Sequence, residues 1–80
     1  MSYVEDLADE LAKDVITASK KLDNPKLIDD VAEELLKTSS TTQEAFLSAV
    51  RVRLAEERAR KYLAARLAQA AKAAKEAAPE

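Results

Sequence analysis

The longest helical pattern in the sequence is residues 42–78, TQEAFLSAVRVRLAEERARKYLAARLAQAAKAAKEAA. Apolar residues recur in it every three or four positions, a spacing that aligns them along one face of a single helix. That face consists of Ala45, Ala49, Val52, Ala59, Leu63, Leu67, Ala70 and Ala74, with Glu56 as its one charged member. A second apolar group occurs only in the first half: Phe46, Leu47, Val50 and Leu54. The pattern predicts that residues 42–55 are buried on two sides of the helix, whereas residues 56–78 have only one narrow apolar side.

Two shorter helices are predicted before this one, over residues 2–22 and 25–37. The first has apolar residues at spacings of three and four, namely Val4, Leu7, Leu11, Val15, Ala18 and Leu22. The second has a broad apolar face made of Leu27, Ile28, Val31, Ala32, Leu35 and Leu36. A face of that breadth is typical of a helix that packs against two neighbours.

Polar residues indicate where each helix begins. Ser2 and Glu5 have the spacing of a capping box, and so do Thr41 and Glu44. Asn24 is expected to cap the middle helix, with Pro25 at its first position, where the missing N–H of proline does no harm.

These elements predict an all-α fold in a single domain, residues 1–80, with two shorter antiparallel helices packed on a long C-terminal helix. A helix of about 35 residues is about 50 Å long, whereas the other two would measure about 30 and 20 Å. The third helix must therefore extend beyond any bundle formed with the first two. Its Ala-rich end, residues 68–80, has little to bury and is expected to fray unless a partner covers it.

Composition excludes most kinds of chemistry. The chain has no Cys, no His and no Gly, so thiolate chemistry, the commonest general base and metal ligand, and glycine-rich phosphate loops are all absent. We therefore predict a protein that is not an enzyme and that holds no metal or cofactor. The acidic start MSYVEDLADEL lacks the apolar region of a signal peptide, and no apolar run reaches the length of a membrane span, which indicates a cytoplasmic protein with no membrane partner.

Charge is distributed unevenly between the two halves. Residues 1–40 contain ten acidic residues and five lysines, whereas residues 41–80 contain eight basic and five acidic residues. Every arginine lies between positions 51 and 66. This asymmetry indicates either that the halves attract each other or that the basic half meets an acidic partner.

The uncovered apolar face predicts a protein–protein interaction module that acts by helix pairing, either by self-association, with a homodimer favoured, or by binding and regulating a partner protein. The candidate partner-binding residues are Val52, Arg53, Glu56, Arg58, Ala59, Arg60, Tyr62, Leu63, Arg66 and Leu67. Glu56 is expected to pair with Arg53 or Arg60, within the chain or across a dimer. Tyr62 is interpreted either as a binding hot spot or as a residue that packs at the end of the core.

Residues 24–63, NPKLIDDVAEELLKTSSTTQEAFLSAVRVRLAEERARKYL, resemble the helix pair of VapB-type ribbon-helix-helix antitoxins. The resemblance covers half of the chain. It implies an N-terminal strand at Ile16–Leu22 that pairs across a dimer, with Thr17, Ser19 and Lys21 facing DNA, and a C-terminal helix that wraps a partner protein.

Two alternative readings accompany the interaction module. One is a small DNA-binding transcriptional regulator or antitoxin, although a sequence pI near 5.2 makes nucleic acid the less favoured partner. The other is a designed helical bundle, which the complete absence of glycine allows.

Overall fold

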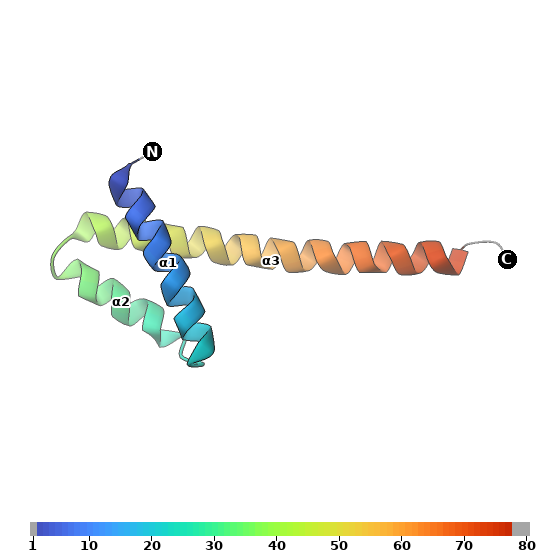
Figure 1. Cartoon of the computed structure of the whole chain (residues 1–80), viewed down its shortest axis with the longest axis horizontal. Coiled ribbons are helices and arrows are strands. Elements are labelled where there is room, and N and C mark those ends of the chain that lie inside the picture. The colour runs from blue at the N-terminus through green and yellow to red at the C-terminus, as the bar shows by residue number, and fades with distance from the viewer. Residues whose placement is uncertain (1, 78–80) are drawn as a thin grey trace.

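Three helices make up the part of the chain that the structure, a computed structural model, describes, residues 2–77. They are α1 (Tyr3–Lys21), α2 (Lys26–Leu36) and α3 (Ser40–Ala77) (Figure 1). The predicted all-α class and the long C-terminal helix are confirmed, and each observed boundary lies within two residues of the predicted one, apart from the predicted end at Ala78, which is outside the described residues.

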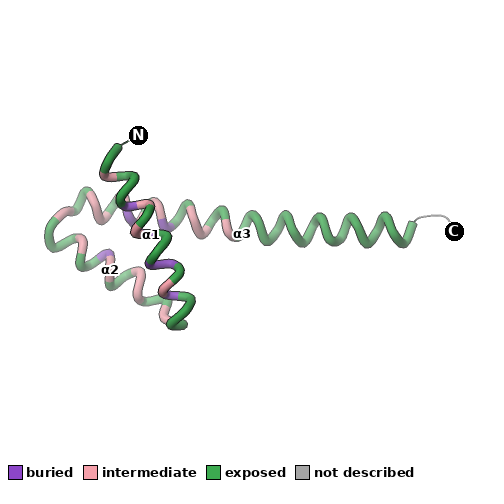
Figure 2. The backbone as a smooth tube through the Cα atoms, in the orientation of Figure 1, coloured by how far each residue is buried: buried purple, intermediate pink, exposed green. Residues whose placement is uncertain are grey.

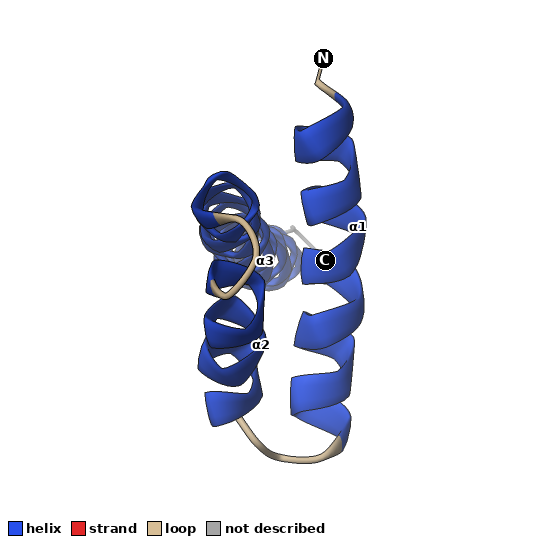
Figure 3. Ribbon diagram, turned by 90° about the vertical axis from the view of Figure 1, so that its left-hand side faces the viewer, coloured by secondary structure: helices blue, strands red, loops and turns tan. Residues whose placement is uncertain are grey.

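The helices form a compact head with one long projection. α1 and α2 are joined by a short turn and lie beside each other, and α1 crosses the N-terminal part of α3 steeply (Figures 1 and 3). Beyond this crossing α3 continues alone, which gives the molecule its extents of 66 × 31 × 13 Å. No helix within residues 2–77 combines the length and the apolar character needed to cross a membrane.

The core lies where α1 and α2 meet the first third of α3. Phe46 of α3 is completely buried, and Val50 follows it one turn later. The buried residues opposite them are mostly small: Ala8, Ala12, Val15, Ile16 and Ser19 of α1, and Ala32 of α2. The hydroxyl of Ser19 is satisfied because it donates to the carbonyl of Ile16, at 3.1 Å.

The buried face of α1 differs from the predicted one. Leu7 and Leu22 were expected in the core but are 47% and 68% exposed, whereas Ala8 and Ala12 are fully buried. The prediction gave most weight to large side chains. Because α1 crosses α3 closely at the bulky Phe46, small residues rather than leucines fit at the crossing.

The C-terminus of α1 ends in a Schellman motif. The N–H of Asp23 donates to the carbonyl of Lys20 at 3.2 Å, and that of Asn24 donates to the carbonyl of Ser19 at 2.8 Å. Asp23 has a positive φ of 50°, the left-handed conformation that glycine usually supplies in this motif.

Two of the three predicted helix starts are wrong in detail. Ser2 does cap α1, since its Oγ accepts the N–H of Glu5 at 3.2 Å. In α2 the capping position is occupied by Pro25, with no side-chain cap, so Asn24 contributes its backbone carbonyl to Leu27 instead, at 3.1 Å.

α3 begins at Ser40, earlier than predicted, and Ser39 caps it in place of Thr41. The Oγ of Ser39 accepts the N–H of Thr42 at 3.1 Å, and its carbonyl accepts the N–H of Gln43 at 3.1 Å. Thr41 then lies within the first turn, where it has no free N–H ahead of it to cap, so the Thr41–Glu44 capping box is not formed.

The segment for which the antitoxin resemblance implies a strand is helical. Residues 16–21 belong to α1, and Ser19, which the resemblance places facing DNA, is buried in the core. The helical spacing of apolar residues extends along the whole of α1 and includes residues 16–21. A strand at these residues would remove Val15 and Ile16 from the core, so the helix is favoured.

Candidate protein-interaction surface

One face of α3 carries a line of apolar side chains, interrupted by a single glutamate, that runs from the core along the exposed part of the helix. We call this line the seam and define it as Ala45, Ala49, Val52, Glu56, Ala59, Leu63, Leu67, Ala70 and Ala74. Ala45 and Ala49 pack partly against the core, but Val52, Leu63 and Leu67 are 68%, 55% and 60% exposed. Figure 2 shows how exposure increases along α3, since the outer part of this helix is coloured as exposed throughout.

The candidate partner-binding residues all lie on α3, at or beyond the crossing with α1. All are exposed except Arg53, which is half-buried. The expectation of burial on two sides over residues 42–55 holds only in part on the seam side, where Ala45 and Ala49 pack partly against the core but Val52 faces solvent. Tyr62 does not pack at the end of the core, because the core ends before it and its side chain is 66% exposed.

Arg53 joins α3 to α1 through a two-point contact. Its Nε donates to Oδ1 of Asp9 at 2.7 Å and its Nη2 donates to Oδ2 at 2.8 Å. This bidentate geometry is the strongest form of a charge-assisted hydrogen bond. The hydrogen bond from Arg53 holds the pKa of Asp9 below its usual value of 3.8. Arg53 is thus engaged within its own chain rather than free for a partner.

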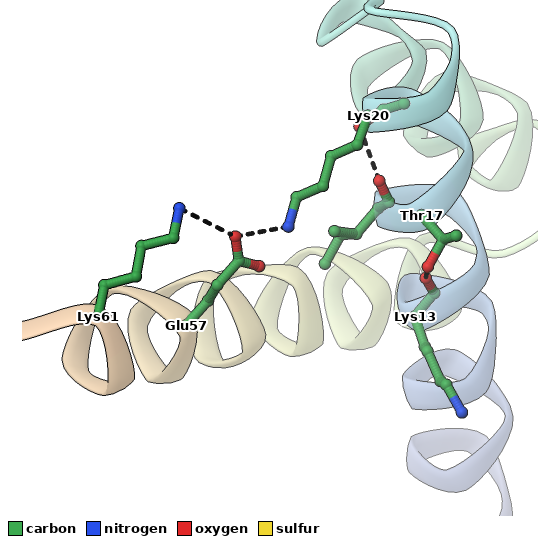
Figure 4. Close-up of polar contacts among 7 residues, drawn as sticks. Lys13, Thr17, Lys20, Glu57 and Lys61 are labelled. Carbon is green, nitrogen blue, oxygen red and sulfur yellow. Dashed lines mark hydrogen bonds and ion pairs between the residues drawn. The ribbon is translucent and has the colours of Figure 1, made fainter. Parts of the chain in front are cut away.

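A second polar contact fixes the other side of the crossing. The Nζ of Lys20, near the end of α1, binds Oε1 of Glu57 on α3, and Lys61 approaches the same oxygen at 3.8 Å (Figure 4). The hydrogen bond from Lys20 lowers the pKa of Glu57 from its usual 4.5. These contacts hold the angle at which α3 leaves the head.

Glu56, the charged member of the seam, pairs with Arg60 on the next turn, with Oε1 and Nε 3.2 Å apart. This is one of the two partners that the sequence suggested. Both side chains remain largely exposed, and an exposed pair of this type stabilises a lone helix by only a few tenths of a kcal/mol, about 0.3–0.5. The pair therefore neutralises a charge on the seam more than it stabilises the fold.

A groove runs beside α1 over the first part of the seam. Its volume is about 450 Å³, and it is lined by Glu5, Asp9, Thr41, Glu44, Ala45, Ser48, Ala49 and Val52. The three seam residues form an apolar floor, while Glu5, Asp9 and Glu44 make its rim acidic. The groove thus continues the seam into the head of the molecule.

A second hollow, of about 440 Å³, lies on the other side of the crossing between α1 and the projecting part of α3. Basic groups dominate it, with Lys13, Lys20, Arg53, Arg60 and Lys61 around Glu56 and Glu57. Because the three ion-pair systems described above already occupy most of these groups, this hollow is part of the junction that orients α3.

Sequence reasoning missed the residues of α1 that contribute to this surface. Glu5 was interpreted only as part of a capping box, and neither Asp9 nor Glu57 was assigned a contact. The uneven charge distribution gave a general signal, since attraction between the acidic first half and the basic second half was one of the two explanations offered for it. The particular pairs depend on how α1 crosses α3, which no spacing along the chain encodes.

The groups that converge at this surface are paired charges and apolar side chains. Within the described residues no group of three or more acidic side chains is placed to hold a metal ion. Comparison of the chain with protein-family models, with curated proteins and with solved structures finds no match.

Proposed function

We propose that this chain is a non-enzymatic protein–protein interaction module that binds another helix along the seam. The observation that carries the proposal is the exposure of Leu63 and Leu67, on a part of α3 that no other element of the head reaches. A single exposed leucine is ordinary on a protein surface, but an aligned row that continues into a groove is typical of a binding site.

The composition of the seam favours a helix as the bound element. Alanine provides five of its nine positions, and small side chains allow two helix backbones to approach closely. Charged residues flank the seam on both sides, as at the edge positions of paired helices. An amphipathic helix laid along such a face would bury the exposed leucines while its own flanking charges stay hydrated.

The proposal is tested with a matched pair of variants. Leu63→Asp places a charge on the seam, whereas Ala65→Asp adds the same charge to the same helix on an exposed position away from it. The full chain and both variants are compared by sedimentation equilibrium and by affinity capture from the host, with circular dichroism as the control for folding.

We expect Leu63→Asp to abolish self-association or capture of the partner, and Ala65→Asp to retain it. A helical monomer that binds the same proteins with or without Leu63→Asp would contradict the proposal.

Nucleic-acid binding is a second candidate, supported by a different observation. Arg51, Arg58 and Arg66 of α3 are exposed and form no ion pair with any residue in the range 2–77. Free guanidinium groups on one helix are suited to phosphate contacts. A gel shift that weakens as salt rises would support this function, and no shift at low salt would exclude it.

A further inference from the structure

Building on the proposed binding role of the seam, we propose that its occupant is a second copy of this chain, whose α3 lies antiparallel along the first. In this arrangement the projecting half of each α3 occupies the groove of the other molecule. Three independent features lead to it: the symmetry of the seam, the position of the groove and the distribution of charge.

The seam has nearly the same spacing when it is read in either direction. Its centre falls at Ala59 and Arg60, about which the positions mirror one another in the following pairs: Ala45 with Ala74, Ala49 with Ala70, Val52 with Leu67, and Glu56 with Leu63. Two copies related by a two-fold axis at this centre therefore place the seam of one directly on the seam of the other. Such an isologous contact is closed. It places every seam residue opposite another seam residue except Ala59, which lies beside the axis and faces Arg60.

The groove is positioned to receive the far end of a partner helix. Its floor is Ala45, Ala49 and Val52, and the N-terminal turns of α1 project past α3 to form one wall (Figure 1). In the antiparallel register the residues above this floor are Leu67, Ala70 and Ala74 of the second copy. The large Leu67 packs against Val52, whereas alanines pack against alanines toward the end of the groove. These small side chains allow the two helices to pack closely.

Charge selects the antiparallel direction over the parallel one. Residues 58–77 carry six basic residues against Glu76, whereas residues 40–57 carry three acidic and two basic residues. The rim of the groove adds Glu5, whereas Asp9 is already paired with Arg53 of its own chain. Antiparallel pairing lays the basic end of each helix beside the acidic rim of the other molecule, and it opposes the two helix dipoles favourably. Parallel pairing would place basic end against basic end.

The ion pair on the seam fits the same register. Glu56 and Arg60 lie 3.2 Å apart and close to the proposed two-fold axis. The two copies would bring two such pairs together, with Glu56 of one copy within reach of Arg60 of the other. A charged residue at this position costs stability in a helix pair but specifies register.

Cross-linking tests the direction and the register, and the chain suits it because it has no cysteine of its own. Ala59→Cys lies beside the axis, so two copies of this variant should form a disulfide on mild oxidation. Ala70→Cys should not link to itself, since the two sites would lie about 30 Å apart, far beyond the reach of a disulfide. A mixture of Ala49→Cys and Ala70→Cys should link to each other.

A second measurement tests the assembly itself in the unmodified chain. Sedimentation equilibrium should give twice the chain mass, with Leu67→Asp reducing it to the monomer mass. Ala68→Asp is the matched control, because it adds the same charge at the adjacent exposed position on another side of the helix, and it should remain dimeric.

The outcomes separate this inference from the proposed function. Efficient self-linking through Ala70→Cys would overturn the antiparallel arrangement in favour of a parallel pair. A wild-type monomer at every concentration would overturn the self-pairing, and if Leu63→Asp then still abolished binding to a different protein, the broader function would stand. A monomer whose binding is indifferent to Leu63→Asp would overturn both.

Discussion

Asp23 occupies the position at which helices most often place glycine. It adopts a φ of 50°, and the left-handed region costs an ordinary residue roughly 1–2 kcal/mol, although aspartate tolerates it better than most. In a sequence with no glycine, the Schellman motif that ends α1 is therefore formed with residual strain.

We expect Asp23→Gly to raise the free energy of unfolding by about 0.5–1 kcal/mol, because relief of the strain outweighs the added freedom of the unfolded chain. Urea unfolding followed by circular dichroism measures the change. Asp23→Ala is the control, since its Cβ retains the strain. Equal stability of the two variants would contradict the explanation.

The start of α3 offers a comparison between two neighbouring hydroxyls. Ser39 caps the helix through Thr42, whereas Thr41 makes no capping bond of that kind. Loss of an N-cap costs about 1 kcal/mol. We expect Ser39→Ala to lower the free energy of unfolding by that amount and Thr41→Ala to leave it nearly unchanged, as measured by denaturant unfolding. The reverse order would support the capping box that the sequence suggested.

At the scale of elements, the direction of α3 depends on α1 as much as on its own sequence. One ion-pair system on each side of the crossing, Asp9 with Arg53 and Glu57 with Lys20, fixes the two helices together. Small side chains of α1, chiefly Ala8 and Ala12, allow the close approach. The groove beside α1 exists because of this geometry.

These ion pairs make the free energy of unfolding depend on pH. Since folding lowers the pKa values of Asp9 and Glu57, the folded protein binds fewer protons than the unfolded chain over this range. Their contribution is complete above the ordinary carboxyl pKa values and is lost as pH falls through the lowered ones. We expect the melting temperature to decline below about pH 5, with Asp9→Asn melting lower at pH 7 and declining less in acid.

The matched control for this experiment is Glu10→Gln, an exposed neighbour on α1 that forms no ion pair with the described residues. It should follow the wild-type acid profile. If Asp9→Asn and Glu10→Gln gave the same profile, the contact with Arg53 would not be the source of the acid sensitivity.

At the scale of the whole molecule, the head buries a small core and the outer half of α3 buries nothing. Isolated helices are marginal in water, and their stability comes mainly from packing of an apolar face. The outer half therefore gains most from a second helix. Fraying was predicted for residues 68–80, of which residues 78–80 lie outside the described part of the chain. Of that segment, residues 68–77 are helical in the structure.

Pairing through the seam links stability to protein concentration. If unfolding is coupled to dissociation of a dimer, each tenfold rise in concentration should raise the melting temperature by roughly 4 °C for two chains of this length. Melting followed by circular dichroism over a hundredfold range measures this. Leu67→Asp should melt at a temperature independent of concentration, and a flat wild-type profile would argue against self-pairing.

Spacing along the chain was sufficient to predict three helices, the length of α3 and the exposure of Leu63 and Leu67, because helical periodicity and the relative lengths of helices are local properties. The tertiary structure alone decided that Ala8 and Ala12, not Leu7, face the core, that Arg53 binds Asp9, and that α1 forms a groove beside the seam. Those features depend on the angle and closeness of one helix crossing, which is set by the fit of side chains distant in sequence.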